Sequence, residues 1–211
     1  MVSSSEDAPA ERLPAAALYP VFFISGFAAI LYQLVWQRAL FRLLGTSMES
    51  VTMVVTAFML GLGLGSLAGG ALSERSRRPL PVLFGLVELA IGAFGLVSMP
   101  LFTWMASVTS GARGAEIGLI AFLAVVIPTL FMGATLPILV AYLVRSSGNV
   151  GRSVGLLYFI NTLGSAAGSL VAGLWVLGAL GQDRAVMLAA VINLLVAAGV
   201  LGAHAAWRRT A

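Results

Sequence analysis

The sequence contains no cysteine and no lysine, and it has a single histidine, His204. The absence of cysteine excludes disulfides, thiolate metal ligands and cysteine nucleophiles. One histidine near the C-terminus provides neither a histidine metal site nor a Ser-His-Asp triad. This inventory therefore predicts no metal site, no catalytic residue and no cofactor.

Charge is also scarce, because only 9% of the 211 residues are charged whereas 60% are hydrophobic. A soluble domain carries about 25% charged residues, and a soluble fold of this size could not hide so much apolar surface from water. The composition predicts an integral membrane protein surrounded by the lipid bilayer. All 12 basic residues are arginine, and in so hydrophobic a chain they indicate membrane topology rather than a nucleic-acid partner.

Several apolar stretches are long enough to cross a bilayer, which needs about 20 mainly apolar residues. They predict an all-α bundle of about six transmembrane helices, at residues 18–44, 50–72, 81–105, 115–144, 153–177 and 185–206. Residues 1–17 are expected to form a cytoplasmic N-terminal tail and residues 207–211 a C-terminal tail. The N-terminal stretch lacks the basic start and the cleavage site of a secretory signal.

The arginines predict the orientation of the bundle. With six spans, eight of the 12 arginines lie on the side of the two termini and four lie on the other side. Because cytoplasmic loops carry an excess of basic residues, both termini are predicted to lie in the cytoplasm.

Two spans carry glycine stripes that are typical of closely packed membrane helices. Gly61, Gly65 and Gly69 follow one another at intervals of four residues, so they share one face of a helix. Gly164 and Gly168 repeat this spacing in the span at residues 153–177. We expect both stripes to let neighbouring backbones approach closely.

Three polar residues are expected near the middle of the membrane: Glu88, Asn161 and Asn193. Glu88 and Asn161 share their helix faces with glycines, so they are predicted to face other helices. Facing lipid, a charge at this depth would cost about 2.5–3.5 kcal/mol or more. Two interpretations remain open: the three residues are hydrogen-bonding glue between helices, or Glu88 binds a cation or carries a proton.

Gln33 and Gln37 form a second polar patch, on the first span. Together with Tyr32 and Trp36 they predict an interfacial belt, since tyrosine and tryptophan are enriched where the membrane meets water. The alternative is that Gln33 joins Glu88 and the two asparagines as a ligand of a substrate or an ion.

Four segments together resemble the membrane module of spermidine-synthase-like proteins: FFISGFAAILYQLVWQRAL, AFMLGLGLGSLAGGALSERSRRP, PTLFMGATLPILV and VGRSVGLLYFINTLGSAAGSLVAG. They occur in the family's order, and the resemblance extends from about residue 21 to residue 198. In that family a hydrophobic half precedes a soluble aminopropyltransferase domain. The resemblance implies a non-catalytic membrane module that anchors or assembles with a partner, either another membrane or soluble subunit or a second copy of itself.

The catalytic half of that family has no counterpart in these residues. A catalytic domain would need a strand, a glycine-rich turn for a nucleoside cofactor and aspartates for the amine substrate. The first helix also departs from the family, because Tyr32 and Gln33 stand where a Tyr-Glu pair is usual. We expect no enzymatic activity from these residues, and the alternative is that they are a fragment of a longer membrane-bound aminopropyltransferase.

The spans also resemble one six-helix half of a major facilitator transporter. The segment SERSRRP is similar to that superfamily's charged loop, with Glu74 as the acid and Arg75, Arg77 and Arg78 as the bases, although the usual glycine between the bases is missing. This resemblance implies a half-size transporter, or a binder of polyamines or other small molecules, that acts as a dimer. A simpler interpretation of the loop is a topogenic signal. Arginine usage and the facilitator-like spans suggest a bacterial inner (plasma) membrane.

Overall fold

The computed structural model describes residues 14–44, 48–108 and 114–210, and every element of regular structure in these ranges is helical. In chain order the elements are α1 (Ala15–Leu44), α2 (Met48–Arg75), α3 (Leu80–Val108), α4 (Gly114–Ser147), α5 (Val150–Val171), the π-helical turn η1 (Ala172–Val176) and α6 (Leu177–Thr210). The all-α prediction is confirmed for this part of the chain. Most of the predicted N-terminal tail lies outside the described residues.

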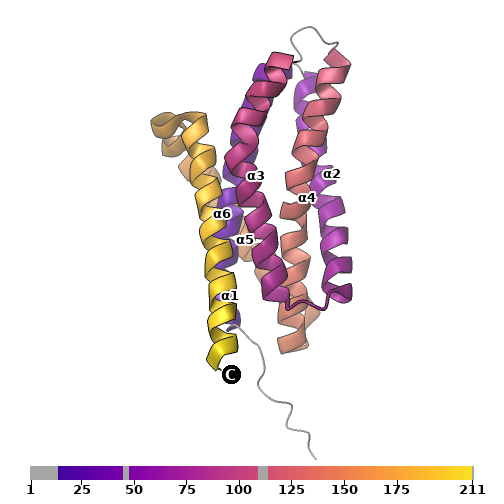
Figure 1. The fold of residues 1–211 in the computed structure, drawn as a ribbon, viewed down its shortest axis with the longest axis vertical. Helices are drawn as coiled ribbons and strands as arrows, with labels where there is room; N and C mark the ends of the chain where they lie inside the picture. Colours follow the sequence, from indigo (N-terminus) through magenta and orange to yellow (C-terminus); the bar gives the residue numbers. More distant parts are fainter. Residues whose placement is uncertain (1–13, 45–47, 109–113, 211) are drawn as a thin grey trace, which may run out of the picture.

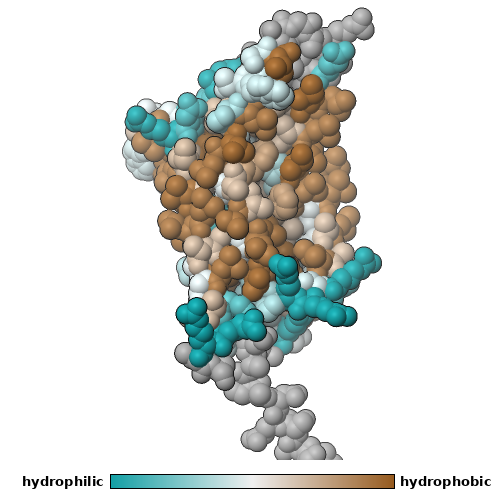
Figure 2. Space-filling view, in the orientation of Figure 1, coloured by the Kyte–Doolittle hydropathy of each residue, from teal (hydrophilic) through white to brown (hydrophobic). Residues whose placement is uncertain are grey.

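Within the described residues, five helical segments are long and apolar enough to cross a membrane. They are Ala16–Arg42, Val51–Arg75, Leu80–Val108, Gly118–Ser147 and Val150–Arg209. Figure 2 shows the surface that they form, in which a broad hydrophobic band lies between two hydrophilic ends. Large apolar side chains such as Leu67, Trp104 and Leu195 are exposed, which is unfavourable in water and suits lipid tails. The structure agrees with an integral membrane protein.

The last of these segments is 60 residues long and reverses its direction. The backbone leaves helical geometry at Gly181, where φ is +72° and ψ is −179°, a region essentially restricted to glycine. In Figure 1 the chain turns at the top of the view, and α6 then descends to the C-terminal end. α6 continues to Thr210, so residues 207–210 are helical. That they form a tail beyond the last span stays a prediction.

A glycine and an asparagine mark where α4 ends and α5 begins. Gly148 follows α4 with a φ of +67°, and the side-chain oxygen of Asn149 accepts a hydrogen bond of 2.9 Å from the backbone N–H of Arg152. This is an N-cap, which satisfies a backbone donor that has no partner within the helix. At the same end of the bundle Arg145 Nη2 donates to the backbone oxygen of Ser73 at 2.9 Å, so the ends of α4 and α2 are tied together.

Three helix pairs make the main contacts of the bundle: α2 with α4, α3 with α6, and α1 with α5. A Cβ atom added at Gly65 on α2 would lie 2.1 Å from the backbone oxygen of Leu130 on α4. One added at Gly164 on α5 would lie 2.0 Å from the backbone oxygen of Phe23 on α1. No side chain fits at such distances, so both glycine stripes lie where two helices approach most closely.

Candidate functional site

The polar core of the bundle is built around Glu88, which is fully buried on α3. Its Oε1 atom accepts a hydrogen bond of 2.6 Å from Ser25 Oγ on α1, and its Oε2 atom accepts one from Asn193 Nδ2 on α6. A buried carboxyl group without such partners would be strongly unfavourable. One acidic side chain therefore joins α1, α3 and α6 inside the bundle.

A cavity of about 140 Å³ adjoins this group, and each of α1 to α6 contributes to its wall. The apolar half of the wall includes Phe58 and Leu62 from α2, Ile91 from α3 and Met132 from α4. The polar half consists of Ser25, Gln33, Thr135, Asn161, Ser165 and Asn193. The wall of the cavity thus combines polar side chains with apolar ones.

The structure brings the four predicted site residues to one place. Gln33, Asn161 and Asn193 line the cavity, and Glu88 stands behind Asn193 as its hydrogen-bond partner. That these residues bind a solute or an ion stays a prediction. The sequence pattern does not single out Thr135, because a hydroxyl in an apolar span usually bonds to its own helix.

Four hydrogen-bond donor groups of the cavity wall are engaged elsewhere. Thr135 Oγ1 donates to the backbone oxygen of Met132 at 2.7 Å, and Ser165 Oγ donates to that of Gly26 at 3.1 Å. Two further donors are bonded to the buried carboxyl group described above. Asn193 Oδ1, in contrast, is buried and has no hydrogen-bond partner. The side-chain amides of Gln33 and Asn161 carry both donors and acceptors, so the wall presents groups of both kinds to the cavity.

Tyr32 and Trp36 do not form an interfacial belt, so that interpretation is wrong. Both side chains are fully buried, and Trp36 Nε1 donates to Ser98 Oγ on α3 at 3.0 Å. The ring of Trp36 also lies 5.5 Å from that of Phe94 and 6.3 Å from that of Phe58. These ring contacts and the indole hydrogen bond stabilise the aromatic residues inside the bundle. Residue type alone does not show whether an aromatic side chain on a span faces lipid or protein.

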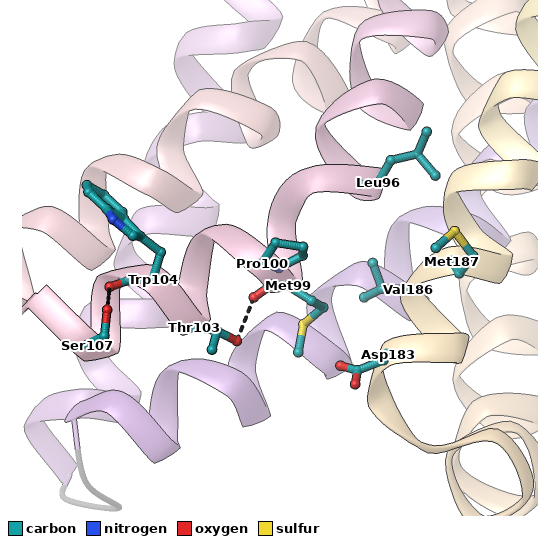
Figure 3. Close-up of a pocket in the computed structure, with 10 residues that line it drawn as sticks. Leu96, Met99, Pro100, Thr103, Trp104, Ser107, Asp183, Val186 and Met187 are labelled. Atoms are coloured by element: carbon teal, nitrogen blue, oxygen red, sulfur yellow. Dashed lines mark hydrogen bonds between the residues drawn. The ribbon is translucent and has the colours of Figure 1, made fainter.

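A larger groove of about 680 Å³ lies between α3 and α6. Figure 3 shows Leu96, Met99 and Thr103 of α3 on one side and Asp183 and Met187 of α6 on the other. Thr103 Oγ1 donates to the backbone oxygen of Met99 at 2.9 Å, so this hydroxyl is used within its own helix. Leu96, Met187 and Asp183 are exposed. The groove lies on the outer surface of the bundle, whereas the central cavity lies among the helices.

The predicted charged loop begins in the last turn of α2, which contains Glu74 and Arg75, and continues beyond it at the hydrophilic end of the bundle where the C-terminus also lies. Glu74, Arg75, Arg77 and Arg78 are all exposed there. Exposed arginines at the end of a membrane helix suit a topogenic role. They lie at one end of the bundle, whereas the residues of the central cavity lie within its helices.

Comparison with known proteins gives a weak similarity that extends over most of the chain. The chain is 24% identical over 181 residues to polyamine aminopropyltransferase 1 of Streptomyces coelicolor. The aligned region covers 85% of this chain and 32% of that protein, so the chain spans about a third of the length of the curated relative it matches. No family profile and no solved structure matches the chain. The aminopropyltransferase resemblance inferred from the sequence motifs is supported in this coarse form.

Proposed function

We propose that this chain is a non-catalytic membrane module that anchors an aminopropyltransferase-type catalytic domain or subunit. The observation that carries the proposal is the extent of the similarity, which covers most of this apolar helical chain and only 32% of a polyamine aminopropyltransferase. The shared region thus corresponds to the helical bundle. The catalytic part would be carried either on the same polypeptide or on a separate partner.

In this proposal the bundle crosses a bacterial plasma membrane six times, with both termini in the cytoplasm. A straight helix of the 60 residues in Val150–Arg209 would be about 90 Å long, whereas the hydrocarbon core is about 30 Å thick. The break at Gly181 supports two crossings by this segment.

The described arginines support the same orientation. Seven lie at the end of the bundle that carries the C-terminus: Arg75, Arg77, Arg78, Arg145, Arg152, Arg208 and Arg209. Three of the described arginines lie toward the other end: Arg38, Arg42 and Arg184. An excess of basic residues favours the first end as the cytoplasmic one.

A second candidate function is transport by two copies, each acting as half of a facilitator-like carrier. The observation that favours it is an internal symmetry of the helix contacts. Suppose that α1, α2 and α3 are exchanged with α4, α5 and α6, respectively. The contact of α2 with α4 then corresponds to that of α5 with α1, and the contact of α1 with α6 corresponds to that of α4 with α3. The contact between α3 and α6 corresponds to itself. Inverted repeats of this kind are common in secondary transporters.

Purification from native membranes in a mild detergent tests the anchoring proposal. We expect the bundle to retain a catalytic domain or subunit in fixed stoichiometry, and the purified assembly to transfer aminopropyl groups to a polyamine. If the partner is a separate subunit, replacement of Arg75, Arg77 and Arg78 by Gln should lower its recovery, whereas Arg184→Gln at the opposite end is the control. A bundle that is recovered alone and inactive in every preparation would contradict the proposal.

Uptake into proteoliposomes tests the second candidate. A carrier should accumulate a radiolabelled polyamine, and Glu88→Gln should reduce the flux, whereas Glu116→Gln at an exposed position of α4 should leave it unchanged. Absence of uptake by the unmodified protein would exclude transport of that solute.

A further inference from the structure

We propose that the cavity enclosed by α1–α6 is a binding site for a small primary alkylammonium ion. The inference rests on the hydrogen-bonding groups of the cavity wall and is independent of the anchoring role proposed above.

Four donors of the cavity wall are already used. Ser25 Oγ and Asn193 Nδ2 donate to Glu88, while Thr135 Oγ1 and Ser165 Oγ donate to backbone oxygens. A hydroxyl oxygen that has donated its hydrogen keeps its acceptor lone pairs. The wall therefore offers several oxygen acceptors to an occupant that brings its own hydrogens.

Asn193 Oδ1 is a further acceptor beside the cavity, and it is buried. Asn193 is 2% exposed and lines the cavity, and its Oδ1 atom has no hydrogen-bond partner. A buried oxygen in this state is unfavourable. In this orientation of the amide, Nδ2 is the donor to Glu88. Because this oxygen has almost no accessible surface, an N–H donor in the cavity would reach it only after a shift of the Asn193 side chain.

The charge and the shape of the site define the ligand further. The Glu88 carboxyl group lies one side chain away from the cavity, behind Ser25 and Asn193. The wall also contains apolar side chains, including those of Leu62 and Ile91. A volume of about 140 Å³ is small beside the roughly 300–1,000 Å³ of common ligand pockets. A cation with several N–H donors and a short alkyl tail complements the acceptors, the acid and the apolar wall together.

A divalent metal ion suits this wall less well. Hard divalent cations prefer several carboxylate ligands, and among the described residues no group of three His, Cys, Asp or Glu side chains is placed to hold a metal. A monovalent metal cation is an alternative occupant that the experiment must distinguish from an ammonium ion.

Binding of radiolabelled methylammonium to the purified protein in detergent tests the proposal. We expect saturable binding, and a rise in thermal stability with ligand concentration. Thr135→Val removes one cavity acceptor and keeps the side-chain shape, and no bond between helices is lost because Thr135 bonds within α4. We expect it to weaken binding about tenfold, as for loss of one hydrogen bond to a charged group.

Thr129→Val is the matched control for this variant. Thr129 lies on the same helix and also donates to a carbonyl of its own helix, Val125 O at 2.8 Å, but it is outside the cavity wall. A second pair compares Gln33→Met in the wall with Gln37→Met one helical turn away. The control variants should bind methylammonium like the unmodified protein.

Competition experiments identify the feature that is recognised. Sodium ions and tetramethylammonium, which has no N–H donor, should compete far less effectively than unlabelled methylammonium. The proposal is overturned by any of three results: no saturable binding by the folded protein, equal competition by sodium or tetramethylammonium, or equal affinities of the Thr135→Val and Thr129→Val variants.

Discussion

The contact between α2 and α4 and the contact between α1 and α5, here called the α2–α4 and α1–α5 seams, are packed in the same way but differ in their polar residues. In both, glycine brings a helix against its partner's backbone, at Gly65 in the first seam and at Gly164 in the second. The α2–α4 seam contains a buried hydroxyl, that of Thr129, which bonds to carbonyl groups of its own helix. In the α1–α5 seam the hydroxyl of Ser165 donates across the seam, to the backbone oxygen of Gly26.

The same contrast is found in the central cavity, which lies between the two seams. α1 and α5 supply four of its polar wall residues, Ser25, Gln33, Asn161 and Ser165, whereas α2 and α4 supply only Thr135. A glycine stripe therefore predicts close packing and does not predict what the seam is used for. The use of a seam depends on the polar residues near the stripe. The helix contacts are nearly symmetric, but most of these polar residues lie on α1 and α5.

The largest loss of stability is expected when a bulky side chain forces the helices of either seam apart. Gly65→Val and Gly164→Val each place a side chain within about 2 Å of a partner backbone oxygen, so each should lower the free energy of unfolding by about 3 kcal/mol or more. Gly63→Val on α2 and Gly155→Val on α5 are the controls, because a Cβ at either position meets nothing within 4 Å. Unfolding by sodium dodecyl sulfate in mixed micelles measures the difference.

The two seams should differ when ligand binding is measured on the milder alanine variants. Gly164→Ala shifts α5 against α1 and displaces the polar wall, so methylammonium binding by the folded fraction should fall more than in Gly65→Ala. If the two variants lost binding equally, the distinction between a scaffold seam and a site-forming seam would be untenable.

An intermediate effect is expected at the acid that links the polar wall to α3 and α6. Glu88→Leu leaves the donors of Ser25 and Asn193 without their acceptor, and the free energy of unfolding should fall by about 1–3 kcal/mol. Combination with Ser25→Ala should cost less than the sum of the two single changes, since the partners share one bond. Combination with Gly65→Ala in the other seam should be additive, and a double-mutant cycle on unfolding free energies checks both statements.

The helices and the polar residues of the core could be predicted from the sequence, but the arrangement of the helices could not. Long apolar stretches and glycines at intervals of four are local patterns, so the all-helical bundle and the stripes could be predicted. The meeting of Gln33 with Asn161 and Asn193 around one cavity depends on which helices are neighbours, and no single span contains that information.

The burial of Trp36 shows a second limit of the sequence. A tryptophan near the end of an apolar span is typical of a membrane interface, but Ser98 on another helix supplies a hydrogen-bond partner and turns the position into core. The backbone break at Gly181 is likewise hard to predict, because Gly173 and Gly178 nearby stand in helical stretches. α5 packs on α1 and α6 packs on α3, and these contacts between distant segments cannot be read from the local sequence.

The smallest effect concerns the hydroxyl that distinguishes the α1–α5 seam. Ser165→Ala removes the hydrogen bond of 3.1 Å to Gly26 O, and such bonds between membrane helices average about 0.6 kcal/mol. Ser169→Ala is the control, because this serine is exposed one turn further along α5. Since Ser165 also lines the cavity, the variant should lose methylammonium affinity more clearly than stability, as measured by binding and unfolding on the same preparation. Loss of stability with unchanged affinity would instead show that this hydroxyl serves packing alone, and the two seams would then differ less than their polar residues suggest.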